Sequence, residues 1–543
     1  MTEKGKILKS ASVIALFTVI SRICGYLRDQ RVALLLGTSP VADSFILVFR
    51  IPNLIRRITG EGSLGGSFIP VFTGYLRGKP RREAWTFAQR VFWDVAAAAA
   101  ILAVLGVVFS KQLIGAFTAM GGGHVGWNLA IYLNRITFPA VLFWSLAALA
   151  CAIQNSFHRF ALPAATPILF NLVFIAFSVG AVYRPIMRWA PAAYRTPAVA
   201  LAVGVLVGAA LQFLVQVPAL AKLGMRFRPE ITFADPGVRK VGKLMVPVFF
   251  GAGIYHINFF VDTIFATSSR MPAGSIASLY VADRMMELVL GSYAIALSTV
   301  ILPAMSHQVA EGKHEDMKRT FGFALRIVSF ITIPAAVGLI LLRVPITQVL
   351  FQHGAFMERS TALTSHALLF YSLGLPAFAA IKLITPMYYS NYDTLTPTRV
   401  AAYALVLHVT LNIVLLFGFG RYLWNASPAL ASSLAAYFNF AVLFVVFRGR
   451  FGPLGGWGIL VSLAKMAVCA AAMSGACLAA LKYSQLAVAE HFLVKAGLLA
   501  GIIAASTGIY FALAWVLGCE ELPELFLLLR RAEPNVAASG LDA

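Results

Sequence analysis

Six arginines lie in the apolar region that covers residues 10–75 of the chain. They are Arg22, Arg28, Arg31, Arg50, Arg56 and Arg57. An arginine at the centre of a bilayer costs roughly 2.5–3.5 kcal/mol, so six of them facing lipid would cost about 15–20 kcal/mol, more than the net stability of a domain. Some of these guanidinium groups must therefore face water, a carboxylate or an anionic ligand.

The spacing of the charges places several of them on shared helix faces. Asp43, Arg50 and Arg57 lie seven residues apart, about two helical turns, and Glu61 lies four residues beyond Arg57. A helix that continues through Pro52 would carry them as one polar stripe. Two further groups have similar spacing: Arg22 with Arg28 and Asp29, and Asp283 with Arg284 and Glu287.

Two interpretations of these arginines compete. For any single arginine, snorkelling to the headgroups or an ion pair between helices explains the residue at least as well as a ligand does. For the whole set a ligand is the better explanation, because basic residues outnumber acids in the stripe. Guanidinium groups bind phosphate in a bidentate manner. The set therefore favours a lipid phosphate or diphosphate, whereas an exporter of cationic drugs would need the opposite charge.

The composition identifies the elements that must position these residues. Of the 543 residues, 59% are apolar or aromatic, only 12% are charged, and the mean hydropathy is +0.81. Soluble domains carry about 25% charged residues. These values exclude a disordered chain, a coiled coil, collagen and a disulfide scaffold, and they predict an all-α protein with many membrane spans. The five cysteines show no metal spacing and are interpreted as small core residues.

The hydropathy pattern contains about fourteen apolar segments, each near the ~20 residues that span a bilayer. They are 10–37, 41–75, 91–117, 127–155, 163–183, 196–220, 244–268, 274–305, 322–342, 361–390, 398–418, 424–447, 458–481 and 492–517. The first two are long, and their glycine and proline residues predict broken or bent helices.

The distribution of basic residues predicts the orientation. With the N-terminus in the cytoplasm, the cytoplasmic loops and ends hold 23 Lys and Arg, and the external loops hold eight. This asymmetry predicts that both termini are cytoplasmic. The external loop at 184–195 breaks the trend. The net charge of +22 is attributed to basic loops beside anionic lipid headgroups, so we expect no nucleic-acid partner.

Three landmarks recur at a nearly constant offset, which indicates an internal repeat. Ile69-Pro70 recurs as Leu302-Pro303, Phe117 as Phe351, and the loop 156–163 as 390–397, at offsets of 233 or 234 residues. The offset equals six segments, so the two units have the same orientation in the membrane. Paired bundles of this kind rock around a central site in transporters. A chance match of proline-containing loop starts is the alternative.

Patterns that would indicate an enzyme are absent or misplaced. The GxGxxG sequence at Gly60–Gly65 follows an apolar helical segment instead of a strand, so we reject a dinucleotide site. Gly204 and Gly208 fit the GxxxG pattern of closely packed helices. The chain has no GK[ST] phosphate loop, no His/Cys metal cluster and no nucleophile elbow. We therefore predict a transporter with no catalytic residues, no bound metal and no cofactor.

Polar residues in two later segments are candidates for ion coupling. Segment 244–268 contains His256, Asn258 and Asp262, and segment 398–418 contains His408 and Asn412, four residues apart. They could bind a coupling cation or relay a proton. Hydrogen bonds between helices are an equally good explanation.

Several of these motifs together resemble a known family. The matching runs are Ser21–Asp29 (SRICGYLRD), Ala42–Phe45 (ADSF), Phe49–Arg57 (FRIPNLIRR), Glu61-Gly62, Phe68–Pro70 (FIP), Tyr280–Glu287 (YVADRMME) and Leu350–Gly354 (LFQHG). They resemble the MurJ (MviN) family of bacterial lipid II flippases, part of the multidrug/oligosaccharidyl-lipid/polysaccharide exporter superfamily. The match extends nearly from end to end.

The resemblance implies an architecture of fourteen helices in two pseudo-symmetric lobes. It assigns an N-lobe to residues 1–221 (helices 1–6), a C-lobe to 222–450 (helices 7–12), two extra helices lining a lipid-tail groove to 451–518, and a cytoplasmic tail to 519–543. By the same resemblance, Arg28, Arg56 and Arg284 match arginines that hold the substrate diphosphate. Other cavity or gating positions are matched by Arg22, Asp29, Asp43, Arg57 and Glu61.

The resemblance also bears on coupling. Some members bind sodium between helices 7, 11 and 12, and Asp262 and Asn412 match that region. The helix-11 carboxylate of those members is Asn412 here, and the loss of a negative charge weakens a cation site. The energy source therefore stays open between Na⁺, H⁺ and the membrane potential.

These inferences predict an inner-membrane flippase of peptidoglycan (cell wall) biogenesis, a process that sets cell shape. It would move lipid II, the undecaprenyl-diphosphate-linked precursor, from the cytoplasmic to the periplasmic leaflet by alternating access. Its partners would be lipid II and membrane lipids, and we expect a monomer. The alternative is a flippase for another polyprenyl-diphosphate-linked glycan, such as an O-antigen or polysaccharide precursor. A cation-coupled drug exporter, a membrane enzyme and a scaffold are disfavoured.

Overall fold

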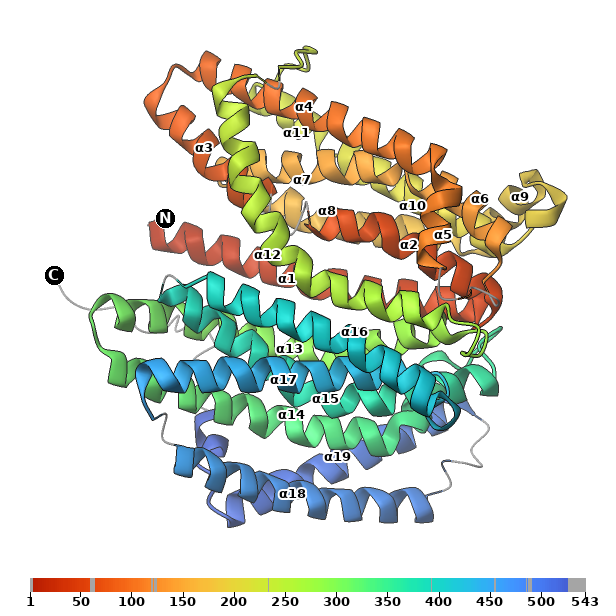
Figure 1. Ribbon diagram of the computed structural model, residues 1–543, viewed down its shortest axis with the longest axis vertical. Helices are drawn as coiled ribbons and strands as arrows, with labels where there is room; N and C mark the ends of the chain where they lie inside the picture. Colours follow the sequence, from red (N-terminus) through yellow and green to blue (C-terminus); the bar gives the residue numbers. More distant parts are fainter. Residues whose placement is uncertain are drawn as a thin grey trace. The chain divides into compact units, whose positions relative to one another are not determined.

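The computed structural model describes residues 3–58, 64–118, 121, 125–232, 234–391, 393–453, 456–484, 486 and 491–525. Within these ranges the chain is almost entirely helical and contains no strand. Figure 1 shows long helices that run roughly side by side within each half of the chain. The predicted all-α class is confirmed.

The helices of the first half lie where the apolar segments predict them. They are α1 (Glu3–Leu36), α2 (Pro40–Ile58), α3 (Leu64–Gly78), α4 (Arg81–Val108), α5 (Ser110–Phe117), α6 (Trp127–Thr137), α7 (Ala140–Ser156), α8 (Ala161–Phe177), α9 (Gly180–Trp189), α10 (Pro197–Leu214) and α11 (Val217–Leu223). A short 3₁₀ turn at Ala192–Tyr194 precedes α10.

The second half consists of longer, mostly unbroken helices. They are α12 (Pro236–Ala266), α13 (Ser275–Ala310), α14 (His314–Phe351), α15 (Glu358–Ser390), α16 (Leu395–Leu423), α17 (Ser427–Phe451), α18 (Gly456–Tyr483) and α19 (Phe492–Val516). Each of the fourteen predicted segments therefore coincides with one helix or with two consecutive helices.

Fewer helices than predicted segments are both long and apolar enough to be assigned as bilayer spans. In the part of the chain that the structure describes, nine helical stretches are long and apolar enough to cross a bilayer, or ten with the bent pair α8–α9. Helices α1 and α2 are not among the nine, and they carry the six arginines. The second predicted segment contains α2 and α3, and residues 59–63 between them lie outside the described ranges. The first predicted segment forms the single helix α1, which is unbroken.

Helix ends repeat with the offset found in the sequence. Helix α5 ends at Phe117 and α14 at Phe351, which are 234 residues apart. Helices α7 and α15 end at Ser156 and Ser390, again 234 residues apart. Because the same elements end at matched positions, the offset reflects a repeated order of helices.

The chain divides into two compact units. The first unit contains residues 1–281 with the short segments Phe351–Leu363 and Gly420–Asn425, and the second contains the rest. Helix α12 thus groups with the first unit, and α13 passes from one unit to the other after Val281. The lobe boundary at residues 221–222, taken from the resemblance, stays a prediction.

Small residues allow α8 and α10 of the first unit to pack closely. A Cβ atom added to Gly204 would lie 2.8 Å from the Cβ of Phe177, and one added to Gly208 would lie 2.9 Å from the ring of Phe170. Larger residues at the two glycines would therefore push the helices apart. This is the packing role that the GxxxG spacing predicts.

One end of the first unit is a dense junction of four segments, which we call the joint. It comprises residues 34–43, 274–278, 351–363 and 420–425. Gly37 and Gly354 both have a left-handed backbone, with φ of 57° and 62°. A Cβ atom at Gly37 would lie 2.3 Å from the Ala355 carbonyl oxygen, and one at Gly354 would lie 2.6 Å from the Leu34 carbonyl oxygen. Only glycine allows the two turns to approach this closely.

Hydrogen bonds hold the four segments of the joint together. The backbone N–H of Ala355 donates to the carbonyl of Leu34 at 2.8 Å, and the hydroxyls of Thr38 and Ser360 are 2.8 Å apart. Asn425 donates both to Ser278 Oγ at 3.0 Å and to the Leu363 carbonyl at 2.8 Å. Two of these four bonds end on backbone carbonyls and two join side chains, and together they fix the positions of the helix ends.

In the second unit the pair α18–α19 is attached to α14 at two levels. Tyr510 of α19 donates its hydroxyl to the Phe330 carbonyl of α14 at 3.0 Å. After α19, the chain turns back, and Arg326 of α14 lies 2.9 Å from Glu520 and 3.6 Å from the buried Glu521. Ser462 of α18 donates to the same Glu521 carboxylate. The two helices beyond the repeat are therefore firmly part of this unit.

Candidate functional site

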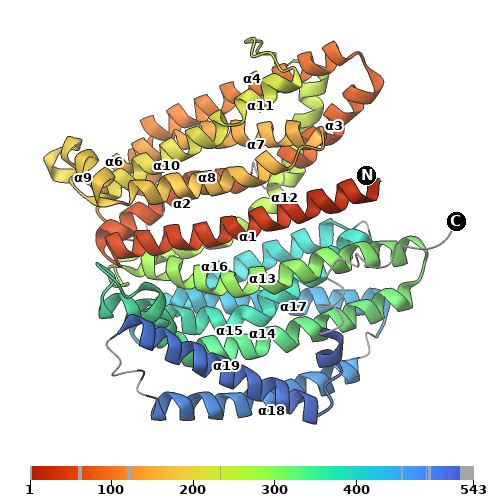
Figure 2. The same ribbon diagram turned by 180° about the vertical axis from the view of Figure 1, so that it is seen from behind.

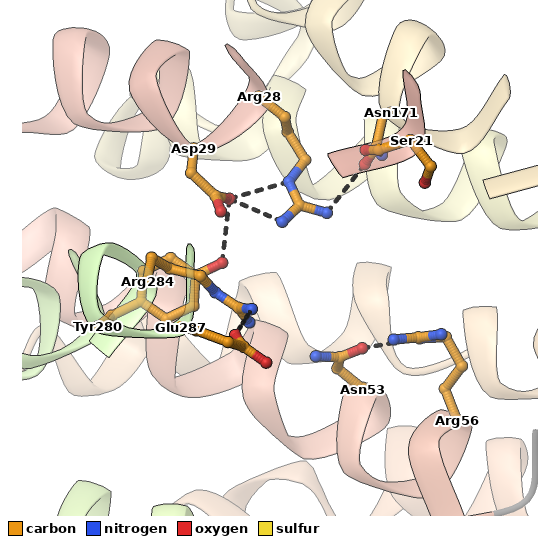
Figure 3. Close-up of polar contacts among 9 residues, drawn as sticks. All are labelled: Ser21, Arg28, Asp29, Asn53, Arg56, Asn171, Tyr280, Arg284 and Glu287. Atoms are coloured by element: carbon orange, nitrogen blue, oxygen red, sulfur yellow. Dashed lines mark hydrogen bonds and ion pairs between the residues drawn. The ribbon is translucent and has the colours of Figure 1, made fainter. Parts of the chain in front are cut away.

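Arg28 is held by a network that links α1, α8 and α13 within the first unit (Figure 3). Its Nε and a terminal nitrogen donate to Asp29 Oδ1 at 2.9 and 2.7 Å, and its other terminal nitrogen donates to Asn171 Oδ1 at 3.1 Å. Asn171 in turn donates to the Ser21 carbonyl at 3.2 Å, which orients its amide. The Tyr280 hydroxyl donates to the same Asp29 oxygen at 3.0 Å.

Neutral side chains orient two arginines of α2. Arg50 donates to the Thr263 hydroxyl and stacks over the Tyr280 ring with a separation of 5.4 Å. Arg56 donates to Asn53 Oδ1 at 2.8 Å and lies 5.8 Å from the centroid of the Trp144 ring. These contacts fix the guanidinium planes. The amide of Asn53 and the indole of Trp144 are neutral groups that orient Arg56.

Arg284 lies on α13, one helical turn after Tyr280, in the part of the helix that belongs to the second unit. It forms an ion pair with Glu287 on the same helix (Figure 3). The Arg284 side chain is 23% exposed and that of Glu287 is 41% exposed. The carboxylate can therefore turn toward solvent and leave the guanidinium group to a competing anion.

The remaining predicted site residues have different surroundings. Arg22 is exposed on α1, and the Nε of Arg57 is buried without a hydrogen-bond partner among the described residues. Asp43 is fully buried in the joint, where it accepts the backbone N–H groups of Gly274 and Ala277 at 2.6 and 2.9 Å. Asp43 thus fixes the start of α13. Glu61 lies outside the described residues.

The two candidates for ion coupling are buried in different compact units. Asp262 of α12 belongs to the first unit and Asn412 of α16 to the second. Asn412 donates to the His408 carbonyl at 3.1 Å, and its Oδ1 has no hydrogen-bond partner in the described part of the chain. His408 itself lies 3.2 Å from the Ser432 hydroxyl. Asp262 and Asn412 stay candidates; the side chain of His256 is outside the described residues.

Sequence reasoning missed the neutral residues that hold the arginines. These are Asn171, Thr263, Tyr280 and Trp144. A polar Asn171 in the otherwise apolar helix α8 is a signal that could have been used, because a buried amide needs a partner. Threonine, tyrosine and tryptophan are ordinary residues of membrane helices, so nothing in the sequence distinguished Thr263, Tyr280 or Trp144.

The site and the fold together define a class of protein. A bundle of apolar helices that carries oriented guanidinium groups on α1, α2 and α13 is suited to holding an anion within a membrane. A solved structure described as an inward-facing multidrug resistance MATE family transporter of the MOP superfamily has the same fold. Its TM-score is 0.64 at 14% identity, over 81% of this chain and 98% of that chain. The molecule therefore has the fold of this class of membrane transporters.

Comparison with closer relatives identifies the family. The model of the lipid II flippase MurJ family matches residues 32–498. A probable lipid II flippase MurJ from Vibrio cholerae serotype O1 is 34% identical over 95% of this chain and 97% of that protein. The lipid II flippase MurJ from Burkholderia cenocepacia is 29% identical over 92% and 96%. The chain belongs to the MurJ family of lipid II flippases.

The fold agrees with this assignment. A solved structure described as lipid II flippase MurJ in an inward closed conformation is 25% identical. It has a TM-score of 0.75 and covers 92% of this chain and 98% of that chain. Family membership and the many apolar helices make the molecule a multi-pass protein of the bacterial inner membrane.

Proposed function

We propose that this protein translocates lipid II from the cytoplasmic to the periplasmic leaflet by alternating access. The observation that carries the proposal is the set of oriented arginines, Arg28 and Arg56 in the first unit and Arg284 in the second. A diphosphate is the anion that best fits several such groups, since each guanidinium offers two parallel donors to phosphate oxygens. Arg22, Arg57 and Asp29 support the same site.

The contacts suggest how the arginines would act. Asp29 and Glu287 balance Arg28 and Arg284 before substrate arrives, and the diphosphate replaces or joins these carboxylates as a counter-ion. Arg56, which is oriented by Asn53 and Trp144, adds a further positive charge to this site. The polyprenyl tail stays among apolar helices, for which the pair α18–α19 is the candidate.

Orientation and partners follow from the same proposal. The charge asymmetry of the loops places both termini in the cytoplasm, and lipid II with the surrounding lipids is the expected partner of a monomeric transporter. The protein would have no catalytic function of its own. With that orientation the joint lies at the periplasmic end of the first unit.

The first test is lipid II transport in proteoliposomes, read out by a membrane-impermeant label on the glycan. Arg28→Glu is expected to reduce transport more than tenfold, because it repels the diphosphate. Arg56→Gln is also expected to reduce transport, because it replaces the guanidinium group beside Asn53 with an uncharged amide. Arg421→Glu, which alters an exposed arginine at the end of α16, is the matched control and should transport normally.

Two outcomes would overturn the proposal. Normal transport by folded Arg28→Glu and Arg56→Gln proteins would show that these arginines do not take part in transport. A second measurement addresses the substrate: other polyprenyl-diphosphate-linked sugars compete with lipid II for the purified protein. If one of them binds more tightly than lipid II, the protein is a flippase for that glycan instead.

A further inference from the structure

Helix α9 is a ten-residue helix that turns sharply away from the helix before it. Helix α8 ends at Phe177 and α9 starts at Gly180, and their axes differ by 71°. Figures 1 and 2 show α9 at the edge of the first unit, beyond the ends of its neighbours. Since α8 has 17 residues, it is about 25 Å long and nearly crosses the ~30 Å hydrocarbon core. Helix α9 therefore starts close to one bilayer surface.

The two faces of α9 differ in polarity. Arg184 and Arg188 lie four residues apart on one face, and both are exposed. Val182 and Ile186 lie on the other face and are half-buried, where α9 packs against α10. Trp189 ends the helix with 90% of its surface exposed. Such a short helix, apolar on one side and basic on the other, is typical of segments that lie in the plane of a membrane surface.

The arginines of this region lack acidic neighbours in the sequence. Between Asp94 and Glu230 the chain contains no Asp or Glu at all. Both of these acids are already engaged, because Asp94 accepts the Thr232 N–H at 2.8 Å and Glu230 pairs with Arg90 at 2.6 Å. In the described part of the chain, no ion pair involves the arginines of α9 or Arg195 in the loop that follows. Their counter-charge must come from outside the protein.

The surroundings identify that counter-charge. An exposed tryptophan beside basic residues at the end of a membrane helix is characteristic of the headgroup layer, where the indole contacts both apolar and polar groups. Arginine binds phosphate through parallel donors. We propose that α9 lies in the headgroup layer and that Arg184, Arg188 and Arg195 bind the phosphates of anionic phospholipids. The loop charges place this surface on the outer leaflet, where these three arginines otherwise break the orientation rule.

The test uses the full-length protein in bilayers and does not depend on transport. The chain has eight tryptophans, so the signal of Trp189 is obtained as the difference between the wild type and Trp189→Phe. Quenching of this signal is measured in vesicles that contain brominated phosphatidylglycerol or brominated phosphatidylcholine. We expect quenching by bromines near the headgroup and a preference for phosphatidylglycerol over phosphatidylcholine.

Removal of the charges gives the second measurement. Each basic residue at an anionic surface contributes roughly a fivefold preference, so Arg184→Gln with Arg188→Gln should lower the lipid preference at Trp189 on the order of thirtyfold. Arg421→Gln, which alters an exposed arginine at the end of α16, away from α9 in the sequence, is the matched control and should leave the preference unchanged. If Trp189 is instead quenched by aqueous iodide and not by brominated lipid, or if the double variant keeps its preference, α9 binds another partner and the proposal is wrong.

Discussion

Arg28 and Arg56 differ in what holds them, and the difference predicts how each responds to substitution. Arg28 has a carboxylate and an amide as partners, whereas Arg56 donates to Asn53 and stacks on Trp144. The orientation of Arg56 depends on the planar guanidinium, which lysine does not have.

Arg56→Lys separates the effect of charge from that of geometry. The lysine keeps the positive charge but loses the bidentate fork and most of the contact with Trp144, so we expect lipid II to bind about tenfold more weakly. The measurement is the dissociation constant of lipid II with purified protein. Arg421→Lys is the control. Equal affinity in the wild type and Arg56→Lys would show that only the charge matters at this position.

Asp393, in the loop between α15 and α16, offers a pH test outside the membrane. Burial raises its pKa, but hydrogen bonds from the Thr396 hydroxyl and backbone and from Arg450 outweigh this effect and lower the pKa to about 2. Because the folded pKa lies below the usual value of about 3.9, the ionised group stabilises the fold above pH 4. That stabilisation is lost as the pH falls through about 2.

The matching variant is Asp393→Asn, which retains a capping oxygen for α16 but removes the charge. We expect it to lose about 0.2–1 kcal/mol at neutral pH, since Arg450 is half exposed and the pair is screened. Thermal unfolding of both proteins in detergent should show a constant difference from pH 5 to 8 that shrinks below pH 4. A difference that stays the same down to pH 2 would exclude the ion pair as its cause.

At the residue scale, the charged residues of the site could be predicted from the sequence, but the residues that contact them could not. An arginine in an apolar run is conspicuous because its burial is costly, so Arg28, Arg50 and Arg56 could be selected by type alone. Their contacts with Asn171 and Thr263 depend on which helices are neighbours. Helical spacing within one segment contains no such information.

At the scale of elements, the joint depends on three turns that have no room for a side chain, at Gly37, Gly274 and Gly354. Its segments come from four distant parts of the chain, and nothing in the sequence indicates that these glycines meet the backbone of another segment. The positions of the helices were easier to predict, because each follows from a long apolar run. The sharp turn before α9 was missed, since hydropathy does not report helix direction.

Gly354→Ala should loosen the joint. The new Cβ atom would lie 2.6 Å from the Leu34 carbonyl oxygen at a left-handed φ, which costs on the order of 1–3 kcal/mol. Hydrogen–deuterium exchange at the Ala355 N–H and at residues 274–277 should then accelerate about tenfold or more. Gly312→Ala is the matched control, since Gly312 has a similar φ of 71° but nothing within 4 Å of an added Cβ. Exchange in Gly354→Ala that is no faster than in Gly312→Ala would show that the added Cβ atom does not loosen the joint.

At the scale of the whole molecule, the transported charge couples the proposed activity to the membrane potential. An anionic headgroup that moves outward is driven by an inside-negative potential, by about 2.3 kcal/mol per net charge per 100 mV. The fixed arginines do not cross the membrane, so they do not cancel this term over a full cycle.

We therefore expect the steady-state share of lipid II in the outer leaflet to fall when the potential is collapsed. The measurement is lipid II labelling in proteoliposomes with a potassium gradient, with and without valinomycin, at constant pH. Protein with Arg28→Glu provides the background. If the share does not depend on the potential, a compensating cation must move with the substrate, and Asp262 and Asn412 become the first residues to test for it.

The joint also bears on how far sequences of this kind can diverge. Part of its cohesion comes from main-chain groups, which every residue type supplies equally, so positions that contribute only a backbone group can change without loss of the contact. Gly37, Gly274 and Gly354 are exceptions, because any replacement brings an atom into occupied space. We expect random mutagenesis to tolerate many substitutions elsewhere in these loops but almost none at the three glycines.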